Sequence, residues 1–449
     1  MNKIFELDNT DYHFNDDIES FEYREVRHEN SDNSMENATY HFFIQDTNAN
    51  ILYSNGYLQQ KLKIVNDNGT LIADDNVALV NGGGLINANR FTLGTTEIES
   101  NINYSALMRQ VLGLMHFTPD YSTSEATNML FYVDTSDTAD RKLLKHHGTL
   151  TDATKLTEFF ENLSINDKYN QGFVERRKLT KNSKTVTLWI PLKYVFDFFR
   201  EYKKVITGFQ VKFEFQRNNS KNMVYTDEQN KDYRVTVEDL SLWLPYVRFK
   251  NSAARIFNEL RLSDKNVEIN WNQHSIVKSN IFLKNSSGSY TIKATSDEVL
   301  SLYVIPQYTD RYENEKQNNM LFDNLDMIEC YLMINNIKVP VVSYTMDFEK
   351  ADYNRLYTAL LESGLNTITS ETGCMVNYSN FGKLYPIICF NLAHHENYTD
   401  TNNLTLEFNW RLRNNPSKNY VFYFILQERK KCYLNIKNQD ITMIKTLKL

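Results

Sequence analysis

Apolar and polar residues alternate in short segments along much of the chain, which is the pattern of strands with one buried face. The most regular segment, residues 209–217 (FQVKFEFQR), alternates strictly from end to end. Turn dipeptides such as Asn55-Gly56 separate the early segments. The predicted strands are 40–45, 51–65, 70–80, 90–100, 184–190 (ended by Pro191), 209–217, 240–244 (ended by Pro245), 267–271, 289–293, 300–305, 327–334, 339–344, 384–392, 404–412 and 420–427.

A few segments have helical periodicity instead. In residues 104–115 the apolar positions Tyr104, Leu107, Met108 and Val111 recur at three- and four-residue intervals, which places them on one face of a helix. Such a stripe is typical of core packing. Shorter helices are predicted at 156–163, 194–199, 253–260 and 351–363.

The strands fall into two successive runs of about eight, which predicts an all-β protein made of two consecutive eight-stranded jelly rolls with a few connecting helices. Residues 1–35 are polar and acidic and are interpreted as an N-terminal arm or loosely held edge. The first jelly roll is assigned to 36–248, with an insertion at 122–172, and the second to 249–449.

Composition narrows the function. The chain has 449 residues and a formal net charge of -7, which argues against a protein that coats nucleic acid with its whole surface. Aromatic residues make up 13%, which favours strands. The first twenty residues do not have the pattern of a secretory signal, and no apolar run is long enough to span a membrane. We therefore expect a chain that is not secreted by a signal peptide.

The triplet Gly82-Gly83-Gly84 is the most conspicuous local feature. A phosphate-binding loop needs glycines at set spacing before a helix, with a lysine and a hydroxyl, and the triplet is followed by Leu85-Ile86 and a predicted strand. We interpret it as a turn or bulge between strands.

Other chemistry-bearing residues are sparse. The pairs His146-His147 and His394-His395 have no metal-ligand spacing and are interpreted as surface or interface histidines. No nucleophile motif is present, so no catalytic, cofactor-binding or metal site is predicted. The four cysteines, which lack CxxC spacing, are expected to be free thiols in a reducing compartment. The cysteines are Cys330, Cys374, Cys389 and Cys432. Three basic runs are interpreted as solvated faces, with a nucleic-acid role as the alternative. They are Arg176-Arg177-Lys178, Lys203-Lys204 and Arg429-Lys430-Lys431.

Three stretches, taken together and in order, resemble a known family. They are residues 91–115, residues 170–217 and residues 381–429. The motifs within them are Gln171-Gly172-Phe173, Ile190-Pro191-Leu192, Val195-Phe196, Tyr202-Lys203-Lys204-Val205, Gly208 and Leu384-Tyr385-Pro386-Ile387. In this respect the chain resembles the hexon-like, double jelly-roll major capsid proteins of Polinton/Maverick- and adintovirus-type double-stranded DNA viruses. It departs from the family pattern at 195–199 (VFDFF) and in its N-terminal arm.

The resemblance implies a structural, non-enzymatic subunit of a virion shell that is assembled inside the host cell. Such a subunit forms homotrimers, or pseudo-hexagonal capsomers, which tile an icosahedral lattice. Its expected partners are other copies of itself, penton proteins and minor capsid proteins, with no sequence-specific nucleic acid, and contact with an inner membrane is left open. Loops such as 122–172 and 306–326 are expected to face outward. The alternatives are a minor capsid or spike protein, or a lectin-like β-sandwich that binds carbohydrate or a receptor.

Overall fold

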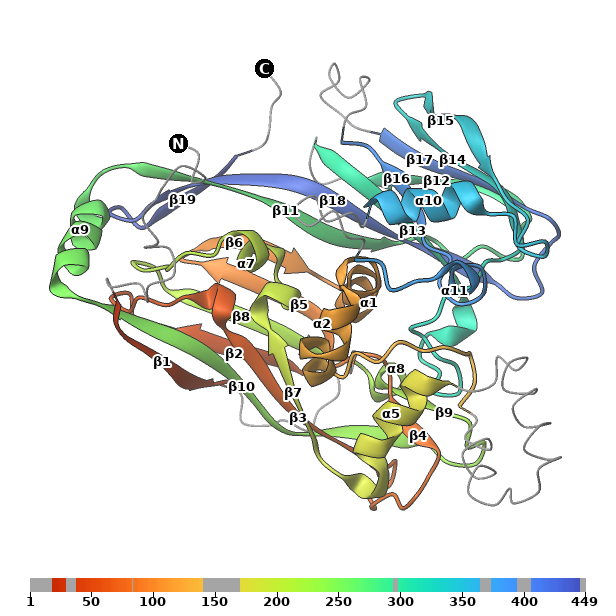
Figure 1. Cartoon of the computed structure of the whole chain (residues 1–449), viewed down its shortest axis with the longest axis horizontal. Coiled ribbons are helices and arrows are strands. Elements are labelled where there is room, and N and C mark those ends of the chain that lie inside the picture. The colour runs from red at the N-terminus through yellow and green to blue at the C-terminus, as the bar shows by residue number, and fades with distance from the viewer. Residues whose placement is uncertain are drawn as a thin grey trace.

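The computed structural model describes residues 18–29, 38–82, 84–139, 170–293, 298–363, 373–393 and 405–444. Within these ranges the strands form four larger antiparallel sheets and one two-stranded sheet. Two of the larger sheets come from the first half of the chain and two from the second half (Figure 1). The predicted fold class, an all-β chain of two consecutive eight-stranded jelly rolls, is confirmed.

The first half contains two four-stranded sheets, with strand orders β1-β10-β3-β7 and β2-β8-β5-β6. A short pair, β4 and β9, lies beside them. The strands are β1 (Ile18–Arg27), β2 (Thr39–Ile44), β3 (Tyr57–Asn66), β4 (Val77–Leu79), β5 (Ile86–Leu93), β6 (Thr96–Asn101), β7 (Val186–Pro191), β8 (Val211–Arg217), β9 (Val224–Thr226) and β10 (Tyr233–Phe249).

The second half repeats this arrangement, with strand orders β11-β18-β13-β16 and β12-β17-β14-β15, and β19 adds to β18. The strands are β11 (Asn266–Lys278), β12 (Ser287–Lys293), β13 (Val299–Tyr308), β14 (Met327–Ile334), β15 (Ile337–Thr345), β16 (Ile388–Asn391), β17 (Thr405–Leu412), β18 (Tyr420–Asn435) and β19 (Asp440–Ile444). Figure 1 shows β11 and β18 as a long ribbon that reaches across the sheets of the first half.

The alternation of apolar and polar residues explains how the strands pair. In β8 every second residue is buried, and Phe213 and Phe215 point into the core between the sheets. The Phe213 ring stacks on Phe91 of β5 with centroids 5.3 Å apart. The intervening polar residues Lys212 and Glu214 face outward and form an ion pair. A strand whose two faces differ this strongly has only one favourable register.

Helices fill the connections between strands. The α-helices are α1 (Ser105–His116), α2 (Pro119–Thr123), α5 (Gln171–Thr180), α6 (Leu192–Val195), α7 (Asp197–Glu201), α8 (Ser220–Met223), α9 (Asn251–Leu262), α10 (Asn354–Ser363) and α11 (Tyr378–Lys383). Short 3₁₀ turns are η3 (Tyr53–Asn55), η4 (Glu125–Met129), η5 (Lys181–Ser183) and η6 (Thr309–Arg311). Helix α1 confirms the predicted apolar stripe, and α9 links the two halves at one end of the molecule (Figure 1).

Pro245 was expected to end a strand, and this expectation is wrong. Strand β10 continues to Phe249. Its pairing with β3 ends at Trp243, so at Pro245 only β1 is paired with the strand and the other flank needs no N–H donor. The free side of the strand is occupied by a loop, where the backbone N–H of Leu52 donates to the Pro245 carbonyl at 3.1 Å. A missing donor is tolerated where one flank of a strand has no ladder.

Two other predicted elements are divided in the structure. The single strand expected at 90–100 is the hairpin β5–β6, because Gly94 adopts a φ of 60° at the turn. The helix expected at 194–199 is the pair α6 and α7, broken at Phe196, whose backbone is extended. In both places a local change of backbone direction interrupts a continuous apolar pattern.

The segments expected to be an arm and an insertion are described in part. Residues 18–27 of the N-terminal segment form β1, an edge strand paired with β10. Residues 122–139 of the insertion are described, and there Leu130 and Phe131 lie in the hydrophobic core. The helix expected at 156–163 lies outside the described residues.

Candidate functional site at the junction of the two halves

A buried cluster of charged side chains joins the two halves of the chain. Asp197, the first residue of α7, accepts a hydrogen bond from Arg109 of α1 at 3.0 Å. The same carboxylate pairs with Arg200 and accepts the backbone N–H of His274, on β11, at 2.6 Å. The His274 ring Nδ1 lies 2.9 Å from the same oxygen, Oδ2, that accepts this N–H. One carboxylate therefore binds groups from both halves.

Glu99 of β6 completes this cluster. Its two carboxylate oxygens accept the backbone N–H groups of Asp197 and Phe198 at 3.0 and 2.9 Å. Arg109 also donates to Glu99, at 3.4 Å. Burial and the nearby Asp197 charge raise the pKa of Glu99 to about 7. Although burial opposes ionisation, Arg200 and Arg109 hold the pKa of Asp197 well below its usual range.

A second buried network joins the halves at the loops beyond the sheets. Arg176 of α5 donates to Asp134 at 2.7 Å, and both side chains are fully buried. Asn318, from the second half, donates to the other Asp134 oxygen at 2.9 Å. The Tyr385 hydroxyl donates to the Asp134 backbone carbonyl at 2.9 Å. Removing one partner from such a network leaves buried polar groups unsatisfied.

Arg311 makes a further link of the same kind. Its guanidinium donates to Asp323 of its own half at 2.8 Å and to Asp137 of the first half at 2.7 Å. Two carboxylates on one guanidinium fix its orientation through parallel charge-assisted bonds.

Aromatic side chains pack across the same junction. The Phe198 ring of α7 meets Trp271 of β11 edge-on, with centroids 5.2 Å apart. Tyr104, just before α1, meets Tyr423 of β18 at 5.2 Å. The Lys278 ammonium lies 5.1 to 5.9 Å from the ring centroids of Tyr104, Tyr423 and Tyr312. These contacts exclude water between the halves and make the ion pairs harder to open.

Gly82, Gly84 and the four cysteines agree with the expectations for them, and Gly83 lies outside the described residues. Gly82 and Gly84 have φ values of 67° and 54°, and the segment leads into β5, as expected for a turn before a strand. All four cysteines, each of which lies in the described residues, are free thiols.

The histidine pairs and basic runs have mixed outcomes. Residues 146–147 and 394–395 lie outside the described residues. The solvated-face interpretation is wrong for Arg176 and Arg177, which are buried, because their guanidinium groups bind backbone carbonyls and aspartates of neighbouring loops. Lys203 and Lys204 are exposed, as expected. Among the described residues, no cluster of three or more His, Cys, Asp or Glu side chains could hold a metal ion. No helix in the described ranges is long and apolar enough to span a membrane.

Sequence reasoning named Arg176 and Tyr104 without giving either a role at the junction, and it did not single out the residues of the Asp197 cluster. Asp197 stands inside the apolar run 194–199, and Arg109 lies between apolar positions of α1. A charged residue within an otherwise apolar segment was the one available signal. Its partners could not be named, because Arg109 and His274 are 88 and 77 positions away from Asp197 in the sequence.

Comparison with known proteins agrees with this architecture. The family described as the double jelly roll-like domain matches residues 148–430, which is more than half of the chain. The chain therefore belongs to the double jelly roll-like domain family. No curated protein matches the sequence.

Several solved structures share the fold. The structure of the Sputnik virophage has a TM-score of 0.60 at 13% identity, and the match covers 100% of this chain and 93% of that one. The Faustovirus major capsid protein has a TM-score of 0.54 at 9% identity, covering 94% and 91%. The mavirus major capsid protein has a TM-score of 0.52 at 10% identity, covering 95% and 90%. At these identities the likeness shows a common fold.

Proposed function

We propose that this chain is a viral major capsid protein, a structural subunit without catalytic activity. The observation that carries the proposal is the junction, where two jelly rolls of one chain are joined by Asp197, Asp134 and Arg311 through buried charged groups. A shell subunit must transmit contact forces without changing shape, and two rolls joined in this way form a single building block. The capsid proteins with the same fold support the assignment.

In the proposed assembly three chains form a homotrimer. Each chain contributes two rolls, so the trimer presents six similar wedges and has a pseudo-hexagonal outline. Such tiles build an icosahedral virion shell, with penton and minor capsid proteins as further partners. We place the first roll at 36–248 and the second at 249–449, with the N-terminal arm 1–35 adding the edge strand β1 to the first roll. Residues 122–172 and 306–326 are placed as outward-facing segments. The interfaces between chains of a stable trimer bury roughly 2,000 Å² or more.

An exposed apolar bulge on β15 is a candidate for one of these contacts with a second copy of the chain. Strand β15 is the edge of its sheet, and residues 340–343 have no partner in β14. There Val341 is 86% exposed and Val342 is 67% exposed. Arg355 of α10 donates to the carbonyl groups of Val342 and Ser343, which holds the bulge in place. An apolar edge that is held rigid favours association with another chain.

The test is the mass and shape of the purified full chain. Light scattering should give a particle about three times the 52.8 kDa chain mass, and electron micrographs of the same peak should show hexagonal outlines. The double variant Val341→Asp/Val342→Asp should weaken association while each chain stays folded, because both side chains are exposed. The matched control Val341→Thr/Val342→Thr keeps the side-chain shape and should have the smaller effect.

A wild-type chain that stays monomeric at high concentration, and that yields no hexagonal particles, would contradict the capsid assignment. If the wild type forms trimers and the aspartate variant does so equally well, the capsid assignment stands and the bulge is not a trimer contact.

A further inference from the structure

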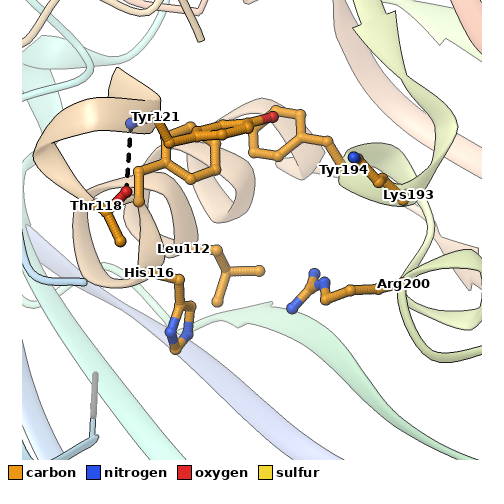
Figure 2. Close-up of a pocket in the computed structure, with 8 residues that line it drawn as sticks. Leu112, His116, Thr118, Tyr121, Lys193, Tyr194 and Arg200 are labelled. Carbon is orange, nitrogen blue, oxygen red and sulfur yellow. Dashed lines mark hydrogen bonds between the residues drawn. The ribbon is translucent and has the colours of Figure 1, made fainter. Parts of the chain in front are cut away.

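A hollow of about 290 Å³ lies beside the junction, between α1, α2, α6 and α7. Figure 2 shows Tyr121 and Tyr194 on one side of it, with Leu112 facing them. The Phe117 ring joins the two tyrosines, with centroids 4.7 Å from Tyr121 and 5.4 Å from Tyr194. The Tyr194 hydroxyl is already bound to the Arg109 carbonyl at 2.7 Å, so the tyrosine presents its ring. A wall of three rings and a leucine is a surface for a flat apolar body.

The polar groups at this hollow are cationic or neutral. Lys193 of α6 and Arg200 of α7 both line it, and none of its lining residues is acidic. Figure 2 shows the Arg200 guanidinium directed toward Leu112. The nearest acid to Lys193 is Glu125 at 3.9 Å, and both side chains are partly exposed, so this pair neutralises the lysine poorly.

Arg200 is also incompletely neutralised. Its partner Asp197 is shared with Arg109 and with the His274 ring. The pKa of Glu99, the other acid of the cluster, is raised to about 7, so at neutral pH this group adds only part of a negative charge. The hollow is therefore lined by two cations, Arg200 and Lys193, whereas the acids near them, Asp197, Glu201 and Glu125, are not part of its lining.

His116, the last residue of α1, adds an uncharged polar group. Its ring Nε2 is buried and has no hydrogen-bond partner in the part of the chain that the structure describes. Burial and the positive charge of Arg200 lower the pKa of His116 to about 3, so the imidazole is neutral at physiological pH. A neutral imidazole nitrogen can donate to or accept from a bound molecule.

We propose that this hollow binds a small aromatic carboxylate, with its ring against Phe117, Tyr121 and Tyr194 and its charged group between Arg200 and Lys193. This function is additional to shell formation and does not depend on it. A cationic ligand would meet two like charges, and a neutral ligand would add no counter-charge to either cation. Because Arg200 also holds Asp197, the bound molecule would contact the cluster that joins the two halves and so stabilise the folded chain.

The experiment uses the full-length chain and the probe 2-naphthoate, with binding measured by isothermal titration calorimetry. Two compounds with the same ring system, neutral 2-acetylnaphthalene and cationic 2-naphthylmethylamine, test the need for a negative charge. We expect 2-naphthoate to bind and both other compounds to bind at least about tenfold more weakly. Saturating 2-naphthoate should also raise the melting temperature, since it binds only the folded state.

Charge variants test the location of the site. Lys193→Glu should weaken 2-naphthoate binding at least about tenfold, because an attractive charge becomes repulsive. The control Lys184→Glu makes the same change in net charge at an exposed lysine just before the start of β7, whereas Lys193 follows the end of that strand. The affinity of this control for 2-naphthoate should stay within about twofold of wild type. Lys193→Gln removes the charge without reversing it, and should give an intermediate affinity.

Three results would overturn the proposal. One is the absence of both heat and a melting shift with 2-naphthoate in the wild type. Another is equal affinity for 2-acetylnaphthalene, which would make the hollow a purely apolar site. The third is unchanged 2-naphthoate affinity in a folded Lys193→Glu chain, which would place the bound molecule elsewhere.

Discussion

Asp197 and His274 come from different halves of the chain and meet twice, through the backbone N–H of His274 at 2.6 Å and through its ring Nδ1 at 2.9 Å. Asp197 begins a short helix of the first half, and His274 lies in the long strand β11 of the second half. This contact, with the arginines around it, makes one carboxylate a shared partner of both halves.

Replacing that carboxylate should strongly destabilise the chain. Asp197→Ala leaves Arg109 and Arg200 without a shared partner and the His274 N–H without an acceptor, which costs about 3–5 kcal/mol of unfolding free energy. Denaturant unfolding of both proteins measures the difference. Glu349→Ala removes an acid of the same charge from an exposed turn and should change stability by less than about 0.5 kcal/mol. Equal stability of the two variants would show that the cluster does not hold the halves together.

The raised pKa of Glu99, about 7, predicts a pH dependence of stability. The folded state binds the proton of the Glu99 carboxyl more tightly than the unfolded state, in which a glutamate titrates near pH 4.5. The contribution of Glu99 to stability is therefore greatest below pH 4.5. It falls as the pH rises toward 7 and then levels off. Glu99→Gln removes this titration, so the wild type should lose about 1–3 kcal/mol relative to the variant between pH 5 and 8. Unfolding curves at several pH values measure this difference. A constant difference across the window would contradict the prediction.

Much of the fold could be predicted from the sequence, because strand identity is a local property. Residues 211–217 alternate so regularly that only one face can be buried, and the structure buries that face. The same holds for α1, whose stripe repeats at helical spacing. The predictions failed where a neighbouring element decides the outcome. The sequence does not show that Pro245 can lie within a strand. That depends on the β3–β10 ladder ending at the pair Tyr57–Trp243, two residues before the proline.

The junction was less accessible to sequence reasoning for a related reason. Arg176 and Arg177 resemble a solvated basic run, and their burial depends on Asp134 and Asp74, which other segments supply. Pairing over such separations leaves no periodic signal in the sequence. What could be inferred was the absence of any motif that names a reaction, together with the fold class, which the strand pattern and the family resemblance both predicted.

Two glycines, Gly172 and Gly82, should differ sharply in their tolerance of alanine. At Gly172 an added Cβ would lie 2.5 Å from the Val133 carbonyl oxygen and 2.6 Å from that of Tyr132, so α5 would have to move. Gly172→Ala should cost about 3 kcal/mol. Gly82 has a φ of 67° and no atom within 4 Å of the added Cβ, so Gly82→Ala should cost about 1–2 kcal/mol of backbone strain alone. Thermal and denaturant unfolding of the two variants measure the difference, and the reverse order would contradict the described packing of α5.

The four free thiols should differ in reactivity. Cys330 and Cys389 are fully buried, and burial raises both pKa values, that of Cys389 to about 12. Cys432 is also buried, and its pKa is raised to about 11. Cys374 is the half-buried one. Because the thiolate is the reactive form and must be reached by the reagent, Cys374 should be labelled first.

Mass spectrometry of the native chain after timed exposure to iodoacetamide measures this order. One label should appear early, at Cys374, and the remaining three should appear together only when denaturant unfolds the protein. The variant Cys374→Ser should then show no early label and unchanged labelling under denaturing conditions. Early labelling of Cys330 or Cys389 in the native protein would mean that the second half opens locally, since both thiols lie in strands of its packed sheets.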